Sequence, residues 1–170
     1  MIDQPATQRQ TIEQKRGREA WQIIKDMKKL SEKDQKEYRS RARGLNAMIQ
    51  VNSLGQTLGF LKAKGKNKID QGKRVINAHY YLLGHLTHWM HSHFDTSIVD
   101  KTREKNDGLL DWVLEETTSS ADYRRATTEC LAFGLWLARF AEAELKDPED
   151  PSSTPDTTSA QETTPQQGGA

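Results

Sequence analysis

Apolar side chains recur every three or four residues along most of the chain, which is the spacing of a helix with one buried face. The first predicted helix covers about residues 7–30, and a break at 31–34 supplies a candidate cap for the second. A third, short helix begins near Leu54 and ends at Gly65. The apolar positions that define these helices are Trp21, Ile24, Met27 and Leu30; Tyr38, Ala42, Leu45 and Ile49; and Leu54, Leu58 and Leu61.

Three more helices are predicted further along the chain. The fourth covers about residues 69–91, a polar connection follows at 92–106, and the fifth is short. The sixth has the clearest pattern, with apolar residues 4, 3, 4 and 3 positions apart. These apolar positions are Ile76, Tyr80, Leu83, Leu86 and Met90; Leu109, Leu110, Trp112, Val113 and Leu114; and Ala126, Cys130, Phe133, Leu137 and Phe140. Since no useful length alternates with a period of two, and no strand is predicted, we expect an all-α fold, a compact bundle of about six helices.

The last part of the chain differs in composition from the rest. Pro148 and Pro151 end the helical pattern, because proline lacks the amide donor and restricts the residue before it. Beyond them Ser, Thr, Pro, Gln and Gly dominate, and such a segment cannot bury enough apolar surface to offset its ordering entropy. Residues 1–146 are therefore predicted to form one helical domain and residues 147–170 a disordered acidic tail.

The chain has a single cysteine, Cys130, which cannot form an internal disulfide and so favours a reducing compartment. Its first residues lack the basic and apolar segments of a secretory signal. No apolar run approaches the roughly 18–20 residues of a membrane span. We expect a cytoplasmic protein that does not contact a membrane.

The histidines are the most plausible place for catalysis or metal binding. His85, His88 and His91 follow one another at intervals of three on the fourth predicted helix, so their rings should fan out rather than converge. We expect solvated or capping histidines at the edges of the helix, although a metal-dependent helical enzyme stays an alternative. Cys130 lies in an apolar stripe and is expected to be a buried small side chain. No phosphate-binding loop or nucleophile elbow occurs, so no catalytic residue, metal or cofactor is predicted.

Charge is divided unevenly along the chain. The overall net charge is +1, but five of the 24 acidic residues and none of the 25 basic ones lie beyond Lys146, so residues 1–146 carry +6. A basic body favours a polyanionic partner. Four lysines occupy alternate positions from Lys62 to Lys68, and such residues on turns and helix faces can follow a phosphate backbone. The candidate RNA-binding residues are Arg16, Arg18, Arg41, Arg43, Lys62, Lys64, Lys66, Lys68, Arg74, Arg124 and Arg125. A solvated surface is the alternative for each group.

Two segments contain specific sequence motifs. They are Asn-x-Leu-Gly-Gln-x-Leu-x-Phe-Leu, which starts at Asn52, and Ala-Phe-x-x-Trp-Leu-x-Arg-Phe-Ala-Glu-Ala, which starts at Ala132. They lie within residues 45–65 and 123–145, and the matching pattern extends from about Thr11 to Leu145. In these segments, and in Gln14-Lys15-Arg16, Ala20-Trp21 and Leu110-Asp111-Trp112, the chain resembles the small helical subunit of the Cmr, or type III-B, CRISPR effector complex.

The resemblance implies a non-catalytic structural subunit that stacks with further copies of itself in the inner filament of the complex. Its expected partners are the guide RNA, the single-stranded target RNA backbone, and the backbone and polymerase-domain subunits. Cleavage and cyclic-oligoadenylate synthesis belong to other subunits. By position, the resemblance favours Arg16, Arg43, Lys62 and Arg124 for nucleic acid; the lysines from Lys64 to Lys68 rest on charge alone.

The sequence departs from the pattern of that family at two positions, where glycine is expected in place of Ser53 and often proline in place of Asn46. Both are expected to affect the turn between the second and third helices. Trp136 and Phe140 match the family, and their spacing predicts a core or subunit contact. The acidic tail has no expected counterpart. A helical adaptor that binds only protein remains the alternative function.

Overall fold

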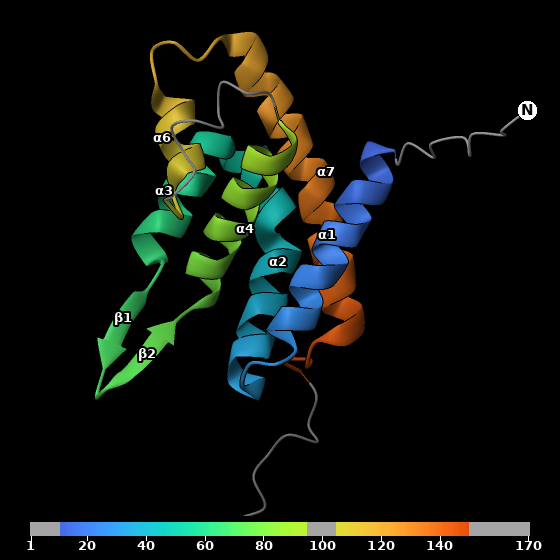
Figure 1. Ribbon diagram of the computed structural model, residues 1–170, viewed down its shortest axis with the longest axis vertical. Coiled ribbons are helices and arrows are strands. Elements are labelled where there is room, and N and C mark those ends of the chain that lie inside the picture. The colour runs from blue at the N-terminus through green and yellow to red at the C-terminus, as the bar shows by residue number, and fades with distance from the viewer. Residues whose placement is uncertain (1–10, 95–104, 150–170) are drawn as a thin grey trace, which may run out of the picture.

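The computed structural model describes residues 11–94 and 105–149 as a mostly helical bundle (Figure 1). Its elements are α1 (Ile12–Met27), α2 (Glu32–Asn52), α3 (Leu54–Lys64), β1 (Asn67–Asp70), β2 (Lys73–Ile76), α4 (Ala78–His93), α6 (Gly108–Leu114) and α7 (Ser120–Glu144). The predicted bundle of about six helices is confirmed. The prediction that the chain holds no strand is wrong, because β1 and β2 form a small antiparallel sheet.

The hairpin turn lies between Asp70 and Lys73, which are opposite one another across the two strands. Its two central residues, Gln71 with φ 48° and Gly72 with φ 76°, both have positive φ. Two consecutive residues of this kind give a turn whose twist matches that of the strands it joins. The apolar residues of this segment therefore belong to a hairpin rather than to the start of a helix.

The fourth helix begins at Ala78 and not at residue 69. Asn77 sets this start, because its side-chain oxygen accepts a hydrogen bond from the Tyr80 amide at 3.2 Å. The first helix is also shorter than predicted. It begins after Thr11, whose side chain caps it, and it ends at Met27 rather than at Leu30. Residues 7–10 of the predicted helix lie outside the described residues.

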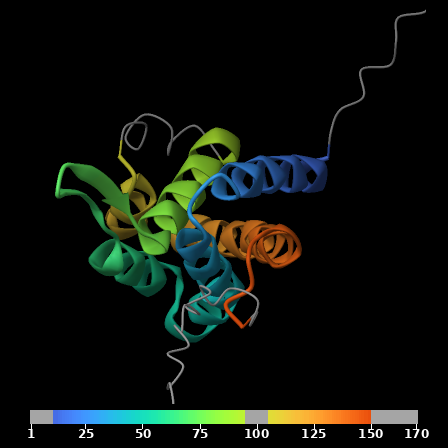
Figure 2. The ribbon, with the colours of Figure 1, turned by 90° about the horizontal axis from the view of Figure 1, so that it is seen from below.

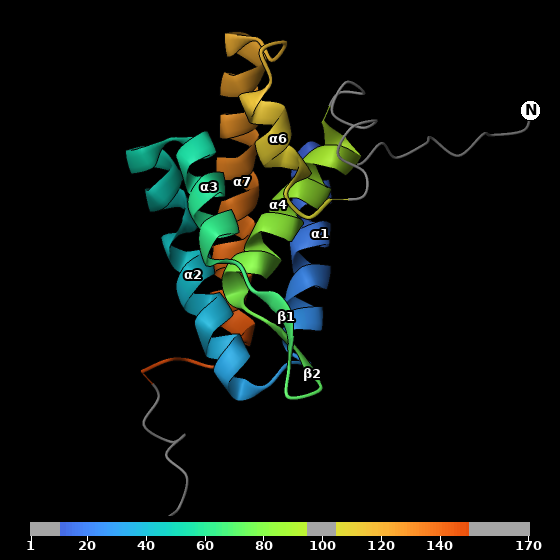
Figure 3. The ribbon, with the colours of Figure 1, turned by 90° about the vertical axis from the view of Figure 1, so that its left-hand side faces the viewer.

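The helices are arranged in three groups that lie side by side (Figure 1). α1 and α7 lie together on one side, α3 and the hairpin lie on the other, and α2 and α4 run between them (Figure 1). The view from below shows the hairpin extending outward from the bundle (Figure 2). Figure 3 shows that the hairpin lies at the end of α3 and leads directly into α4.

The core consists of aromatic and aliphatic side chains from all six described helices. Trp89 of α4 stacks on Phe133 of α7, with 4.6 Å between ring centroids and 9° between planes. Tyr38 and Cys130 are fully buried, so the predicted burial of the cysteine is confirmed. Two apolar positions of the predicted stripes are instead open to solvent, Trp21 at 36% and Leu114 at 69% exposure.

The two departures from the family pattern lie in different places. Ser53 joins α2 to α3 as expected, and its φ of 75° and ψ of 163° fall in a region that glycine occupies far more readily than serine. Asn46 lies inside α2, so the prediction that it affects this turn is wrong. Its side-chain amide donates to the Leu131 carbonyl of α7 at 2.9 Å, close to Gly134.

Most of the predicted acidic tail lies outside the described residues, which end at Glu149. Its first residue, Asp147, is held by Arg39 of α2, with 2.7 Å between the guanidinium and the carboxylate. Arg39 also donates to the Leu145 carbonyl at 3.0 Å. Arg39 therefore holds the start of the predicted tail against α2.

Candidate nucleic-acid interface

The structure gathers most of the predicted lysines at the end of α3 and along the hairpin. We call this region the hairpin basic surface. It consists of Lys62, Lys64, Lys66, Lys68, Lys73 and Arg74, together with Arg41 of α2. Each of these residues is exposed. Arg41 joins the group because α2 runs beside α3, and its charge reaches the same buried histidine, His79, as those of Lys64 and Lys66.

The base of the hairpin is fixed by one side chain. Asn77 accepts a hydrogen bond from the Lys66 amide at 2.9 Å and donates one to the Lys64 carbonyl at 2.8 Å. The Asn77 amide also donates to the Lys66 carbonyl at 3.1 Å. These contacts hold the lysine-bearing backbone against the start of α4, so the positions of these cations are set by the fold.

Some of these cations are already neutralised within the chain. Lys62 lies 2.6 Å from Asp107, and hydrogen bonding to this carboxylate raises the pKa of Lys62. Lys68 lies 3.9 Å from Asp70. Lys64, Lys66 and Arg41 form no ion pair with any described residue. Lys73 and Arg74 likewise form no ion pair with a described residue, so these five are the cations of this surface that are available to an anionic ligand. Among them, Lys64, Lys66 and Arg41 are the three whose charges act on His79.

A buried histidine lies beneath these cations. His79 is 7% exposed, and its Nδ1 has no hydrogen-bond partner among the described residues and lies 3.9 Å from a Glu37 oxygen. Burial lowers the pKa of His79, and the nearby charge of Arg41 lowers it further. The ring of Phe60 packs against it in a T-shaped contact. Neither Phe60 nor His79 is among the predicted site residues, and the spacing of Phe60 and Lys64, one helical turn apart, is the only sequence feature that links this ring to the lysines.

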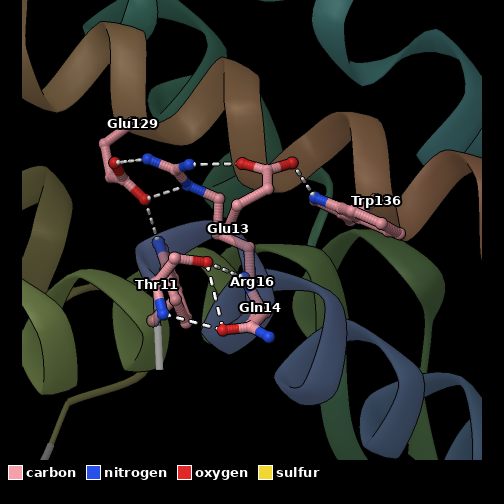
Figure 4. Close-up of polar contacts among 7 residues, drawn as sticks. Thr11, Glu13, Gln14, Arg16, Glu129 and Trp136 are labelled. Carbon is pink, nitrogen blue, oxygen red and sulfur yellow. Dashed lines mark hydrogen bonds and ion pairs between the residues drawn. The ribbon is translucent and has the colours of Figure 1, made fainter. Parts of the chain in front are cut away.

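Arg16 has a different environment from the other candidates. Its guanidinium is only 14% exposed and lies 2.6 Å from carboxylate oxygens of both Glu13 and Glu129 (Figure 4). Hydrogen bonding to Glu129 raises the pKa of Arg16. Glu13 in turn accepts a hydrogen bond from the Trp136 indole at 2.7 Å. This network joins α1 to α7, so the contacts of Arg16 are structural.

The remaining candidates are dispersed. Arg124 and Arg125 lie at the start of α7, at the opposite end of the molecule from the hairpin (Figure 1). Both are exposed, and Arg125 lies 3.3 Å from Asp122 and over the ring of Phe94. Arg43 of α2 is 3.5 Å from a carboxylate of α7. The structure does not bring these residues to the hairpin basic surface.

The histidines of α4 have separate structural partners. His85 shares a hydrogen bond of 2.8 Å with the Tyr38 hydroxyl, and burial lowers its pKa to about 4. His88 is exposed and lies 3.4 Å from Glu19, and His93 stacks on Trp89. The expectation of a solvated or capping histidine is therefore wrong for His85, which is half-buried and bonded to Tyr38 of α2. Within residues 11–94 and 105–149, no three His, Cys, Asp or Glu side chains are placed to hold a metal ion.

A second exposed surface lies on the opposite side of the bundle, where α1 meets α7. Trp21 packs edge-on against Phe140, with 5.1 Å between centroids, and Phe140 also contacts Trp136. Arg18 lies beside this aromatic group. We call Trp21, Trp136 and Phe140 the α1–α7 aromatic surface. Trp21 is 36% exposed, whereas Trp136 and Phe140 are partly buried and pack against the core, so this surface continues the core outward between α1 and α7.

These features define a small helical protein with one cationic surface and one aromatic surface on opposite sides (Figure 1). The chain belongs to the Cmr5 family of CRISPR-associated proteins, whose sequence model (Cas_Cmr5) matches residues 12–144. It is thus a small subunit of a type III-B CRISPR effector complex, and the resemblance found in the sequence is confirmed.

A crystal structure of a CRISPR-associated Cmr5 family protein from Thermus thermophilus has the same fold. The two structures superpose with a TM-score of 0.61 at 21% sequence identity, covering 81% of this chain and 100% of the Thermus chain. No described helix is both long and apolar enough to span a membrane.

Proposed function

We propose that the chain is a non-catalytic, RNA-contacting subunit that binds the guide–target RNA backbone through the hairpin basic surface. The observation that carries the proposal is the group of unpaired cations around the α3–β1 junction, Lys64, Lys66 and Arg41. Cations of this kind bind phosphate without reading base sequence. Such binding suits a subunit of a guided complex, in which base pairing supplies the specificity.

The other predicted RNA contacts divide by their surroundings. Lys62, Lys68 and Arg74 border these three cations and can add to the same surface. Arg18, Arg43, Arg124 and Arg125 stand apart and would need a separate segment of RNA. Arg16 would have to leave two carboxylates to reach a phosphate, which makes it the weakest of the predicted contacts.

The proposed lack of catalysis is supported by the state of the reactive side chains. Burial raises the pKa of the Cys130 thiol, so the thiolate needed for nucleophilic attack is disfavoured. Glu129, the most buried carboxylate of the Arg16 network, is fully engaged by Arg16 and Trp89. His85 is held by Tyr38. These groups serve packing and pairing, as expected for a cytoplasmic scaffold subunit.

Assembly is the second part of the proposal. We assign the α1–α7 aromatic surface to contact with a further copy of the chain in the inner filament. Trp21 is 36% exposed, so substituting it tests this assignment directly. Trp21→Glu should abolish self-association of the full chain in sedimentation at rising concentration without lowering its melting temperature by more than a few degrees. Unchanged self-association would exclude this surface as the filament contact.

Binding of the full chain to a fluorescent single-stranded RNA tests the proposed RNA contact of the hairpin basic surface. Lys64→Glu with Lys66→Glu should weaken binding by about tenfold or more, because two phosphate-binding charges are reversed. Lys15→Glu with Arg139→Glu makes the same change in net charge on α1 and α7, and should have a much smaller effect. Equal losses in the two double variants would remove the hairpin basic surface from the proposal.

The alternative is a helical adaptor that binds only protein, and the α1–α7 aromatic surface is the observation that favours it. An adaptor would co-purify with the larger subunits of the complex and would show no RNA binding at any salt concentration. In that case the cations of the hairpin would be a solvated face.

A further inference from the structure

An exposed aromatic ring lies among the unpaired cations of the hairpin basic surface. Phe60 of α3 is 38% exposed, although its neighbours Leu58 and Leu61 are buried. Lys64 lies one helical turn further on and therefore shares the same side of α3. A large apolar side chain in this position covers little of the core, so packing alone does not account for it.

The contact with His79 does not bury Phe60. Phe60 and His79 meet in a T-shaped contact, with 5.6 Å between centroids and 68° between planes. In such a contact the histidine covers at most one face of the phenyl ring. His79 is itself fixed, being 7% exposed between α2 and α3. The ring of Phe60 is therefore positioned by a fixed neighbour, while 38% of the residue stays open to solvent.

Positive charges from three segments lie near the His79 that contacts this ring. Arg41 of α2, Lys64 at the end of α3 and Lys66 just before β1 each help to lower the pKa of His79. None of the three forms an ion pair with a described residue. Glu37 of α2, whose side chain is 32% exposed, places an opposing carboxylate 3.9 Å from the His79 ring. An aromatic face bordered by available cations is the arrangement by which proteins hold single-stranded nucleic acids.

We propose that Phe60 stacks on an unpaired base of RNA while Arg41, Lys64 and Lys66 bind the phosphates on either side of it. The inference rests on the proposed RNA contact and names its ligand more closely: a nucleotide whose base is outside a helix. Bases inside an A-form duplex stack on one another and offer no free face to a side chain. The site is expected to be tolerant of base identity, because every base has a stacking face.

The test uses the full chain and two fluorescent RNA probes of equal length, an ordinary single strand and an abasic ribose-phosphate chain. The ordinary strand should bind at least about fivefold more tightly than the abasic chain, the smallest gain expected from one stacked base. Phe60→Leu should lose this advantage and bind both probes alike, whereas Phe60→Tyr should keep it. Leu135→Ala, which alters an exposed apolar residue of α7, is the matched control and should leave both affinities unchanged.

Each outcome separates the stacking site from the proposed function. If wild type binds both probes equally, or Phe60→Leu retains the full advantage, the stacking proposal is wrong, while RNA binding through charge still stands. If neither probe binds, the proposed function itself fails and the stacking site fails with it. Should Phe60→Leu prove unstable, Phe60→Gln removes the ring from this exposed position in the same way and should also lose the advantage, and a retained advantage would overturn the proposal. A 2-aminopurine in the ordinary strand adds a direct signal, because stacking on Phe60 should change its fluorescence.

Discussion

Glu129 is a single side chain that ties three helices together. From α7, it accepts two hydrogen bonds from Arg16 of α1, at 2.8 and 2.6 Å, and one from the Trp89 indole of α4, at 2.8 Å. Burial alone would raise its pKa, but the hydrogen bonds from Arg16 and Trp89 outweigh that effect, so the pKa of Glu129 is lowered. The charged form is therefore favoured in the folded protein.

Glu129→Gln should lower the free energy of unfolding by about 2 kcal/mol, because it weakens charge-assisted bonds to a mostly buried guanidinium. Urea unfolding at pH 7 measures this loss. Glu144→Gln removes a more exposed pair with Lys28 and should cost less than about 1 kcal/mol. A lowered pKa stabilises the fold above the unfolded value near 4.5 and this contribution is lost as the pH falls. Equal losses in the two variants at pH 7 would contradict the role given to Glu129.

Ser53 carries backbone strain at a position where glycine is expected from the sequence. Its φ of 75° and ψ of 163° are unfavourable for a side chain, yet it joins α2 to α3 and its carbonyl accepts from both the amide and the hydroxyl of Thr57. Ser53→Gly should raise the free energy of unfolding by about 1 kcal/mol in urea titrations. Ser53→Ala keeps the strain and should give no gain. A gain of the same size in both variants would trace the effect to the lost hydroxyl instead.

At the scale of elements, Asn77 connects the hairpin to α4. It caps the helix through Tyr80 and holds the backbone of Lys64 and Lys66 with three hydrogen bonds. One of these comes from its own backbone amide and survives substitution of the side chain. The side chain therefore serves two elements at once.

Asn77→Ala should lower the free energy of unfolding by about 1–2 kcal/mol, the usual cost of a lost cap. It should also weaken RNA binding, because the lysine backbone at the base of the hairpin is no longer fixed. Asn77→Asp keeps the cap oxygen and loses only the donor to the Lys64 carbonyl, so its stability should fall between the two. Thermal and urea unfolding measure the order of stability of wild type, Asn77→Asp and Asn77→Ala. Full stability in Asn77→Ala would rule out this double role.

The hairpin also shows where a periodic pattern misleads. Ile69 and Ile76 are seven residues apart, which fits two helical turns and extends the predicted helix back to residue 69. Ile69 is in fact 79% exposed. The contrary signal was local: Gly72 after Gln71 allows the two positive φ angles of a tight turn. Six helices could be predicted because their apolar stripes are long, whereas strands of four residues carry too little pattern.

At the scale of the molecule, the sequence indicates which residues are charged but not which charges remain available. Arg16 and Glu129 are 113 positions apart, and only packing of α1 on α7 brings them to 2.6 Å. Arg41 and Lys64 are brought to one surface in the same way, by α2 and α3. The predicted set of basic residues thus contained every member of the hairpin basic surface except Lys73, but the division into paired and unpaired cations required the fold.

The two surfaces suit a subunit that has neighbours on one side and a ligand on the other. The α1–α7 aromatic surface and the hairpin basic surface lie on opposite sides of α2 and α4 (Figure 1). A protein contact at the former would leave the latter open to RNA. Filament contacts and RNA contacts should therefore be separable by mutation.

The most direct test of the central claim is the salt dependence of RNA affinity. If the chain neutralises about four phosphates, the logarithm of its affinity for single-stranded RNA should fall against the logarithm of salt concentration with a slope of about −3. Lys64→Glu with Lys66→Glu should reduce that slope to about −1.5, since two of the phosphate contacts are lost. Lys15→Glu with Arg139→Glu should keep it at about −3. A slope near zero in the wild type, or one unchanged by loss of the two hairpin lysines, would contradict an RNA-binding role for this surface.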